Sequence, residues 1–387
     1  MLDLVGQDGI LRRVGNPPPV GPIGNRRAGY QRAPQSKMTN YPNIIPVGLV
    51  GFGNAGRTFH APVIRAVPGL DLSCIVQRTG DSAREKYPDV RVVRTIDELL
   101  ADNSIRLVVI ATPNDSHFEL ARQCLLAGRD VVVDKPFTNT SSEAHELDEL
   151  ARAEGRVLSV YQDRRWDGDF ITVQKLIGSG TLGRLALFES HFDRYRLARR
   201  PNQWREAAGP GSGVLFDLGP HLVDQALVLF GMPEAIAADV RIEREDAVVD
   251  DAFDILLRYP KLTVLLRATM IACAPGPRFV LNGTLGSYVK HGMDPQEDAL
   301  KAGAQPVSPG WGEEDPSHWG TLTLAGPNGV VRQPVPTEAG DYRKFYSNVR
   351  DAILLRAPLA VTALHAARII RLLELARESS KQWLEAR

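Results

Sequence analysis

Two ionisable residues, Asp217 and His221, are spaced in the sequence for acid–base chemistry. On a helix, residues four apart project from the same face, and Asp224 lies one further turn along. A carboxylate beside an imidazole orients the ring and tunes its pKa toward neutrality, which suits a general acid or base. The alternative is a histidine packed in the core of an amphipathic helix that also carries Leu218 and Leu222. No third His, Cys or Glu stands at ligand spacing nearby, so the segment does not predict a metal site.

A lysine at the end of an apolar run is the second candidate. Asp134-Lys135-Pro136 follows the run 131–133, which has the character of a buried strand. This places Lys135 at the carboxyl edge of the expected sheet, where open α/β proteins bind ligands. A lysine so close to a core loses hydration unless an anion or an oxygen meets its ammonium group. The alternative is a surface lysine that pairs with Asp134.

The motif Gly51-Phe52-Gly53-Asn54-Ala55-Gly56 predicts a dinucleotide site. It directly follows the apolar run 46–50 and opens a helix, which is the setting of a G-x-G-x-x-G loop in a βαβ unit. Gly51 would permit the tight turn, Gly53 the approach of a pyrophosphate, and Gly56 the contact between helix and strand. The N–H groups of the helix would then face the phosphates. A glycine-rich turn without a ligand is the alternative interpretation.

The end of the second expected strand favours NADP over NAD. An NAD site usually places Asp or Glu there, where it bonds the 2′-hydroxyl of the ribose. Here the strand ends Gln77-Arg78-Thr79, so a 2′-phosphate would meet no carboxylate at Gln77. Arg78 and Thr79 would supply a charge and a hydrogen bond to that phosphate. NAD is the alternative, because Asp71 or Asp81 is close enough in sequence to approach the ribose. In that case Arg78 is only a solvated residue at the end of the strand.

Residues 42–162 alternate short apolar runs with helical segments, which predicts a doubly wound parallel (Rossmann) sheet. The expected strands are Val47–Phe52, Leu72–Val76, Leu107–Ala111, Val131–Val133 and Val157–Tyr161. The expected helices are His60–Val67, Ile96–Leu100, Ser116–Ala127 and Ser142–Ala153. Ser116 is expected to cap its helix with Glu119 as the partner in a capping box, and Gly128 to end it.

Residues 163–387 predict an α+β domain with a large, mainly antiparallel sheet, because runs of strands follow two helices. The expected helices are Phe170–Ile177, Leu215–Phe230 and an amphipathic closing helix, Thr362–Glu378. The expected strands are Ala235–Ile242, Phe253–Tyr259, Leu262–Met270, Phe279–Asn282 and Gly286–Lys290. The Pro/Gly/acidic stretch Pro306–Trp319 is interpreted either as a lid or as a long connection.

Composition excludes several classes of protein. The 387 residues carry 46 Lys+Arg against 46 Asp+Glu, so no broad charge favours nucleic acid or an anionic membrane. No apolar run approaches the length of a membrane span, and three scattered cysteines predict no disulfide framework. A reducing, cytoplasmic setting is therefore expected. Residues 1–41 are rich in Pro, Gly and Arg, which predicts either a flexible extension or an artefact of gene-start assignment, with translation beginning at Met38.

Taken together, the motifs resemble the Gfo/Idh/MocA oxidoreductases, the family of glucose–fructose oxidoreductase and inositol dehydrogenase. The resemblance covers about nine-tenths of the chain. It rests on the glycine loop, Thr112-Pro113-Asn114 with His117, Asp134-Lys135-Pro136, and the pattern Gly213/Asp217/His221/Asp224. Further stretches are similar to its NADP-dependent scyllo-inositol dehydrogenases: 159–167, Arg194-Tyr195-Arg196, Trp204-Arg205-Glu206 and 288–298. The family often has Glu where Asp134 stands, and closer relatives tend to carry Asn where Asp163 stands.

The resemblance implies that Lys135, Asp217 and His221 form a catalytic group that oxidises a hydroxyl-bearing ring carbon of a polyol or sugar. In this reading His221 takes the hydroxyl proton, Lys135 bonds the same oxygen, and Asp217 holds the substrate or the imidazole. It also places Thr112, Pro113, Asn114 and His117, together with Lys135, at the cofactor. Our candidates for contact with the substrate are Tyr161, Arg165, Trp166 and Tyr195.

Two other functions fit the same motifs. One is a dehydrogenase of an aldose or a ketosugar, which would share the fold and differ in the pocket. The other is a regulatory protein that binds the dinucleotide without catalysis; retention of Lys135, Asp217 and His221 favours the enzyme. The resemblance further implies a homodimer or homotetramer, because relatives bury the open face of the second sheet between subunits.

Overall fold

The structure is a computed structural model that describes residues 44–199 and 204–382. The predicted N-terminal extension, residues 1–41, lies outside the described residues. The described strands form two sheets, one of six strands and one of eight. The predicted boundary after residue 162 stays a prediction; the last strand of the first sheet ends at Val160 and the first strand of the second begins at Leu185.

The six-stranded sheet is parallel throughout, with the order β3-β2-β1-β4-β5-β6. Its strands are β1 (Ile45–Val50), β2 (Leu70–Val76), β3 (Arg91–Val93), β4 (Leu107–Ile110), β5 (Asp130–Val133) and β6 (Leu158–Val160). Every residue of β4 and β5 is buried, as expected for central strands covered by helices on both faces. The strand order reverses between β1 and β4, which makes the crevice at their carboxyl ends the place for a ligand. The predicted doubly wound sheet is confirmed.

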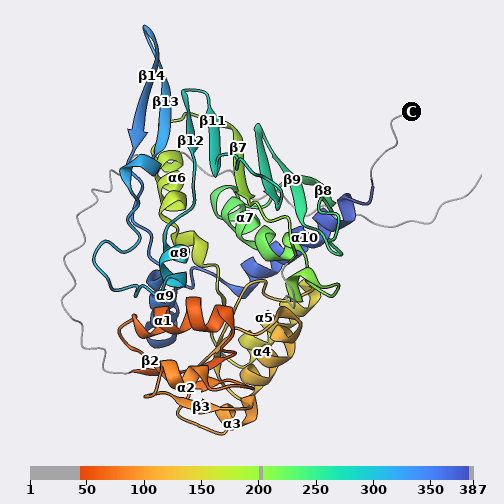
Figure 1. The fold of residues 1–387 in the computed structure, drawn as a ribbon, viewed down its shortest axis with the longest axis vertical. Helices are drawn as coiled ribbons and strands as arrows, with labels where there is room; N and C mark the ends of the chain where they lie inside the picture. Colours follow the sequence, from red (N-terminus) through yellow and green to blue (C-terminus); the bar gives the residue numbers. More distant parts are fainter. Residues whose placement is uncertain (1–43, 200–203, 383–387) are drawn as a thin grey trace, which may run out of the picture. The chain divides into compact units, whose positions relative to one another are not determined.

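The helices of this first part are α1 (Ala61–Arg65), α2 (Ser82–Lys86), α3 (Ile96–Leu100), α4 (His117–Leu126) and α5 (Ser141–Ala153). In Figure 1, α4 and α5 lie side by side against the sheet. The capping box predicted at Ser116 is wrong: its hydroxyl bonds the Pro113 carbonyl and the Thr112 hydroxyl instead of capping α4. A capping box occurs at α5, where Thr140 and Glu143 bond each other's backbone N–H groups.

The second sheet has the order β14-β13-β12-β11-β7-β10-β9-β8, and only the β7–β10 pair is parallel. Its strands are β7 (Leu185–Asp193), β8 (Ala235–Arg241), β9 (Ala252–Tyr259), β10 (Leu262–Thr269), β11 (Phe279–Gly283), β12 (Gly286–Lys290), β13 (Gly320–Gly326) and β14 (Gly329–Val335). This confirms the predicted mainly antiparallel sheet. Sequence analysis missed β7, because Phe188 and Phe192 alternate there with polar residues. It also missed the β13–β14 hairpin, which Figure 1 shows at the end of the sheet and whose second strand has almost wholly exposed residues.

Helices α6 (Gly168–Gly178), α7 (Val214–Phe230), α8 (Gln296–Lys301), α9 (Arg343–Leu355) and α10 (Ala363–Ser379) complete the second part. The predicted closing helix α10 contacts α7 and β8 in this part and also α5 and β6 in the first (Figure 1). At one of these contacts, the Glu374 carboxylate accepts bonds from the Ser141 N–H and hydroxyl at 2.7 Å each. The closing helix therefore fixes the first sheet against the second, and with it the cavity between them.

The stretch 306–319 is an anchored connection. The Lys290 ammonium, fully buried, pairs with the Glu314 carboxylate at 2.7 Å, and Thr337 donates to the other oxygen of Glu314. Trp311 donates its indole N–H to Gln296 at 3.0 Å. None of its residues lines the cavity described below. Of the two interpretations offered by the sequence, the structure therefore supports the connection.

Candidate active site

A cavity of about 830 Å³ opens between the carboxyl edge of the six-stranded sheet and helix α7. At one end it is lined by Gly53, Asn54 and Ala55 of the glycine loop and by Ala111, Thr112 and Pro113 after β4. At the other end it is lined mainly by charged residues. One apolar, glycine-lined region and one region of convergent polar groups are what a cofactor and a substrate need in a shared site.

The glycine loop has the geometry that a pyrophosphate requires. Gly51 has a φ of +97°, and a Cβ there would lie 2.7 Å from the Ala111 carbonyl oxygen. A Cβ on Gly56 would lie 2.1 Å from the Gly51 carbonyl oxygen, so the helix packs directly on the turn. A Cβ on Gly53 would meet nothing within 4 Å, because this residue faces the open cavity. The roles predicted for the three glycines therefore agree with the backbone, and the loop fits a dinucleotide.

Thr112 and Pro113 line the cavity, whereas Asn114 and His117 stand behind them. The Asn114 amide donates to Asn139 at 2.8 Å and to the Gly211 carbonyl at 3.0 Å. The ring nitrogens of His117 lie 2.8 Å from the Pro136 carbonyl and 3.0 Å from the Thr112 carbonyl. Both buried side chains therefore bind neighbouring loops to the sheet edge and do not line the cavity; their contact with the cofactor stays a prediction.

The loop after β2 leaves Arg78 and Thr79 exposed and outside the cavity lining. The Gln77 side chain is used internally, since its oxygen accepts from the Ala83 N–H at 2.8 Å and its amide donates to the Thr79 carbonyl at 2.9 Å. Asp81 is paired with Arg94 at 2.8 Å. The Asp81 carboxylate is thus already paired, whereas the exposed Arg78 forms no hydrogen bond or ion pair with a side chain of the described residues.

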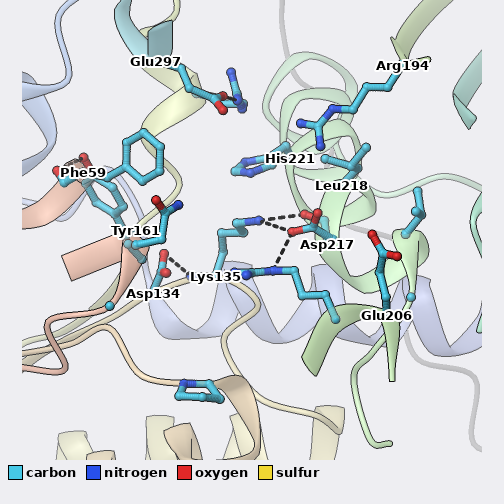
Figure 2. A pocket seen from close by; sticks show the side chains of 18 of the residues that line it. Phe59, Asp134, Lys135, Tyr161, Arg194, Glu206, Asp217, Leu218, His221 and Glu297 are labelled. Atoms are coloured by element: carbon cyan, nitrogen blue, oxygen red, sulfur yellow. Dashed lines mark hydrogen bonds and ion pairs between the residues drawn. The ribbon is translucent and has the colours of Figure 1, made fainter. Parts of the chain in front are cut away.

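Lys135 reaches across the cavity to helix α7. Its ammonium lies 2.8 Å from the backbone carbonyl of Asp217 and 3.1 Å from the Asp217 carboxylate, as Figure 2 shows. The Arg205 guanidinium pairs with the same carboxylate oxygen at 3.0 Å. Burial raises the pKa of Asp217, but the charges of Lys135 and Arg205 outweigh it and hold that pKa well below its usual range. Lys135 is thus held as a fixed cation by an ionised partner.

The start of α7 is built to present Asp217 and His221. The helix begins after Gly213, whose φ is +90°, and the Asp250 carboxylate accepts from the Leu215 N–H at 2.7 Å. Pro220 stands inside the helix, has no N–H, and crowds the carbonyl four residues before it. Asp217 lies in the first turn, where the helix dipole favours a negative charge.

His221 points into the cavity beside Lys135 (Figure 2). The residue is 5% exposed, and its Nδ1 is buried without a hydrogen-bond partner among the described residues. Burial, and then the positive charges of Lys135 and Arg164, hold the pKa of His221 well below its ordinary value. The imidazole is therefore neutral near pH 7 and able to accept a proton. The Asp217 carboxylate bonds Lys135 and Arg205 and forms no hydrogen bond or ion pair with the His221 ring, so of the two roles predicted for it, the holding of the imidazole is not what the structure shows.

Only one of the four substrate candidates lines the cavity. It is Tyr161, whose hydroxyl donates to the Phe59 carbonyl at 3.2 Å. Arg165 turns away and forms a two-fold pair with Asp224 at 2.6 and 2.8 Å. Trp166 packs against Phe345 with ring centroids 5.8 Å apart, and Tyr195 is 56% exposed. Arg165, Trp166 and Tyr195 therefore do not line the cavity, and their contact with the substrate stays a prediction.

Neighbours of those candidates line the cavity instead. Arg164 lines the cavity where Arg165 was expected, and Arg194 and Arg196 line it where Tyr195 was expected. Further charged residues complete this wall: Asp163, Arg205, Glu206 and Glu297. The guanidinium of Arg194 points into the cavity toward His221 (Figure 2) and has no partner among the described side chains. Arg164 pairs with Glu297 and Asp167. In each case the sequence indicated the right stretch. Arg164 and Arg165 lie in the 3-10 turn η3 (Asp163–Trp166), and 194–196 pass through a β-bridge at Tyr195, so adjacent side chains in both stretches point in different directions.

Asp163 adds a carboxylate to this wall without a side-chain partner among the described residues. Burial raises the pKa of Asp163 to about 6, against the lowering effect of Arg164. The folded state therefore prefers the protonated form more strongly than the unfolded chain does. The stabilisation that follows is complete below about pH 4, the ordinary pKa of Asp, and is lost as the pH rises through 6.

Asp163→Asn is therefore expected to raise the melting temperature at pH 8 by about 2 °C, roughly the effect of 1 kcal/mol, and to raise it less at pH 5, where part of the stabilisation of wild type remains. Asn carries no charge at any pH, so the variant does not lose stability between these pH values as wild type does. Thermal melts from pH 5 to 8 measure the difference, with the exposed Asp298→Asn as control. An equal difference at every pH would contradict the assignment of a raised pKa to Asp163.

Two family models match most of the chain. One, described as "Oxidoreductase family, NAD-binding Rossmann fold", matches residues 45–162. The other, described as "Oxidoreductase family, C-terminal alpha/beta domain", matches residues 174–385. The chain therefore belongs to the Gfo/Idh/MocA family of oxidoreductases, and it is an NAD(P)-binding oxidoreductase. The resemblance noted in the sequence is thereby confirmed.

Individual relatives cover nearly the whole of both chains. The uncharacterized oxidoreductase YdgJ of Escherichia coli is 45% identical over 337 residues, 87% of this chain and 96% of the relative. The scyllo-inositol 2-dehydrogenase (NADP(+)) IolW of Bacillus subtilis is 38% identical over 340 residues, 88% of this chain and 95% of the relative. The solved structure of yvaA from Bacillus subtilis is similar with a TM-score of 0.85 and 38% identity, over 88% of this chain and 97% of that chain.

Neither a metal cluster nor a membrane-spanning helix occurs in the part of the chain that the structure describes. Within residues 44–199 and 204–382, no group of three or more His, Cys, Asp or Glu side chains is arranged to hold a metal ion. Among the helices of the same residues, none has the length and apolar character needed to cross a bilayer.

Proposed function

We propose that this protein is an NADP-dependent dehydrogenase that oxidises a hydroxyl of a cyclic polyol, with scyllo-inositol as the best candidate, or reduces the corresponding ketone. The observation that supports it most is the placement of Lys135 beside His221 in one cavity with the glycine loop. A neutral imidazole, a fixed ammonium and a dinucleotide cradle are the groups that exchange of a hydride and a proton with an alcohol needs.

In this proposal His221 is the general base in oxidation and the general acid in reduction. Its lowered pKa keeps the imidazole unprotonated and ready to take the hydroxyl proton. Lys135 donates a hydrogen bond to the same substrate oxygen and stabilises the negative charge that develops there. Asp217 fixes the direction of the Lys135 side chain through its carboxylate and its carbonyl. When bound, the nicotinamide supplies the hydride acceptor or donor.

The cavity wall supports a polyhydroxylated substrate. It presents donors, such as the guanidinium of Arg194, and acceptors, such as the carboxylate of Asp163, around one space. A ring with a hydroxyl on every carbon can bond donors and acceptors on all sides, whereas an apolar substrate would leave these groups unsatisfied. The relative IolW, named as a scyllo-inositol 2-dehydrogenase (NADP(+)), supports the same class of substrate.

Arg78→Ser is expected to raise the Kd for NADP about tenfold and to leave that for NAD nearly unchanged, because one charge-assisted bond to the 2′-phosphate is lost. Fluorescence titration with each dinucleotide measures both constants. Arg84→Ser is the matched control, since Arg84 is also an exposed arginine near this loop and pairs with Asp81. A wild-type preference for NAD, or equal affinities of the variant and wild type for NADP, would refute the assignment.

An oxidative assay at 340 nm tests the function directly. Scyllo-inositol, myo-inositol, glucose and xylose are each offered with NADP and with NAD. A higher kcat/KM for an inositol with NADP is the expected result. Turnover of an aldose instead would retain the roles of Lys135 and His221 and replace the substrate. Binding of NADP without turnover of any compound would favour a dinucleotide-sensing regulator.

The expected homodimer or homotetramer, in a cytoplasmic setting, is part of the same proposal. The face of the second sheet that α7 does not cover carries apolar side chains within reach of solvent, among them Leu256, which is 39% exposed. Pairing of such faces between subunits would bury them. Light scattering coupled to size-exclusion chromatography measures the number of subunits, and a monomer at micromolar concentration would contradict the prediction.

A further inference from the structure

A buried histidine that the proposed mechanism does not use lies behind the catalytic lysine. His60 is fully buried and ends the π-helical turn η1 (Gly56–His60), which starts at the last glycine of the dinucleotide loop. π-helical turns are rare and occur often at functional sites. His60 has two polar neighbours: its Nδ1 lies 2.6 Å from the Tyr346 hydroxyl, and its Nε2 lies 3.6 Å from Oδ1 of Asp134.

These two neighbours favour a proton on Nε2 of His60. An ionised carboxylate can only accept hydrogen bonds. If Nε2 carried no proton, its lone pair would face the negative charge of Asp134, which is unfavourable. With the proton on Nε2, this nitrogen faces the carboxylate across 3.6 Å, an electrostatic contact longer than a hydrogen bond, and Nδ1 accepts from the Tyr346 hydroxyl. A hydroxyl can serve as donor here, which makes both contacts favourable at once. Tyr346 is also fully buried, so water does not replace it as a partner.

The histidine bears on catalysis through Asp134. Oδ1 of Asp134, the oxygen that faces His60, accepts from the backbone N–H of Lys135 at 2.9 Å. In Figure 2 Asp134 lies beside Tyr161 and Phe59, with Lys135 extending from it toward Asp217. The Tyr161 ring packs on the His60 ring at a centroid distance of 4.3 Å. Burial raises the pKa of Asp134, but His60, Lys135 and His117 together lower it, so the carboxylate facing His60 is ionised.

We propose that His60 is a positioning residue: oriented by Tyr346, it holds the Asp134 carboxylate, and thereby the backbone from which Lys135 extends. The line of contacts runs from Tyr346 on α9 through His60 beside the glycine loop to Asp134 after β5. Groups that hold a reacting group in place typically affect activity 10- to 100-fold without touching the substrate, as roughly seen for partners of metal ligands. The inference rests on the proposed function of Lys135.

Tyr346→Phe, His60→Gln and His60→Leu separate positioning from packing. Tyr346→Phe deletes one hydroxyl and is expected to lower kcat about tenfold, with KM for the polyol and Kd for NADP changed less than about twofold. His60→Gln offers an amide N–H and an oxygen to the same two neighbours and should retain most of kcat. His60→Leu fills the space without either polar contact, and its kcat should fall at least as far as that of Tyr346→Phe. Tyr259→Phe, which removes a buried hydroxyl bond to the Gly231 carbonyl, is the matched control.

A spectroscopic measurement makes the test independent of the substrate. The measurement uses ¹⁵N-histidine-labelled protein without NADP, and the His60 resonances are assigned by their loss in His60→Gln. They should show the Nε2–H tautomer in wild type. They should change in Tyr346→Phe and stay unchanged in the control Tyr259→Phe. An Nδ1–H tautomer in wild type would overturn the inference even if no polyol is turned over. Equal kcat for the Gln and Leu variants, or a loss of NADP binding in Tyr346→Phe, would overturn it too. If wild type shows the expected tautomer but turns over none of the substrates, the result would count against the proposed function and not against the placement of His60.

Discussion

Lys135→Met is expected to lower kcat/KM about a thousandfold while the protein keeps its fold and most of its affinity for NADP. The ammonium bonds Asp217 and lines the cavity, where it can also donate to a substrate oxygen. Loss of a donor that stabilises a developing oxyanion typically costs about 100- to 1000-fold, and here a full positive charge is lost with it. Methionine fills a similar volume without charge or donor, so the effect is chemical and not one of packing.

Steady-state kinetics with the polyol and NADP measure the loss, and fluorescence titration measures NADP affinity. Lys175→Met is the control, because Lys175 is an exposed lysine on α6 that pairs with Glu338 outside the cavity. Asp217 keeps Arg205 as a partner in the Lys135 variant, so the carboxylate stays ionised and α7 stays in place. A loss below tenfold would show that Lys135 does not bond the reacting oxygen.

His221→Asn is expected to reduce kcat for oxidation about 100- to 10,000-fold at pH 7, the range of general-base catalysis. Asparagine keeps a polar group of similar size but takes up no proton. Because burial and the nearby charges hold the pKa of His221 well below its ordinary value, the wild-type rate of oxidation should stay level through neutral pH. It should fall only where the imidazole becomes protonated, well below pH 6.5, and this fall should disappear in the variant.

The measurement is kcat for oxidation between pH 5 and 9 for both proteins. The exposed His145→Asn on α5 is the control, since it removes an imidazole far from the cavity lining. A wild-type rate that has already fallen to half its plateau at pH 6.5 or above would show that the base has an ordinary or raised pKa and is not this imidazole. Retention of turnover in His221→Asn would assign the proton to another group.

Much of the site follows from local sequence. A glycine loop after an apolar run can form only one kind of strand–turn–helix, because Gly51 needs a positive φ and Gly56 has no room for a Cβ. Asp217 and His221 share a face because a helix has 3.6 residues per turn. Lys135 stands at the sheet edge because it directly follows a buried strand. Each of these features depends on residues within a few positions of one another, which is what sequence patterns report.

The sequence could not show which of two adjacent side chains faces the cavity. Arg164 and Arg165 are chemically identical, and only the placement of Asp224 on α7 and of the Ala360 carbonyl draws Arg165 away. Tyr195 is displaced in the same way by Arg194 and Arg196, since its backbone forms a bridge with Ile271 and its side chain points out. Side-chain direction in such short irregular segments is decided by long-range packing, because no periodic pattern constrains it.

What the sequence determined by itself is therefore the kind of protein: two sheets, a dinucleotide loop, and a lysine, an aspartate and a histidine available for acid–base chemistry. What only the tertiary structure decided is how distant residues complete the site. Asp217 turned out to hold Lys135 and not His221, and His60 met Tyr346 across a separation of 286 positions. The physical reason is that backbone conformation and hydrophobic period are local properties, whereas the partner of a buried charge is set by whichever chain segments the core brings together.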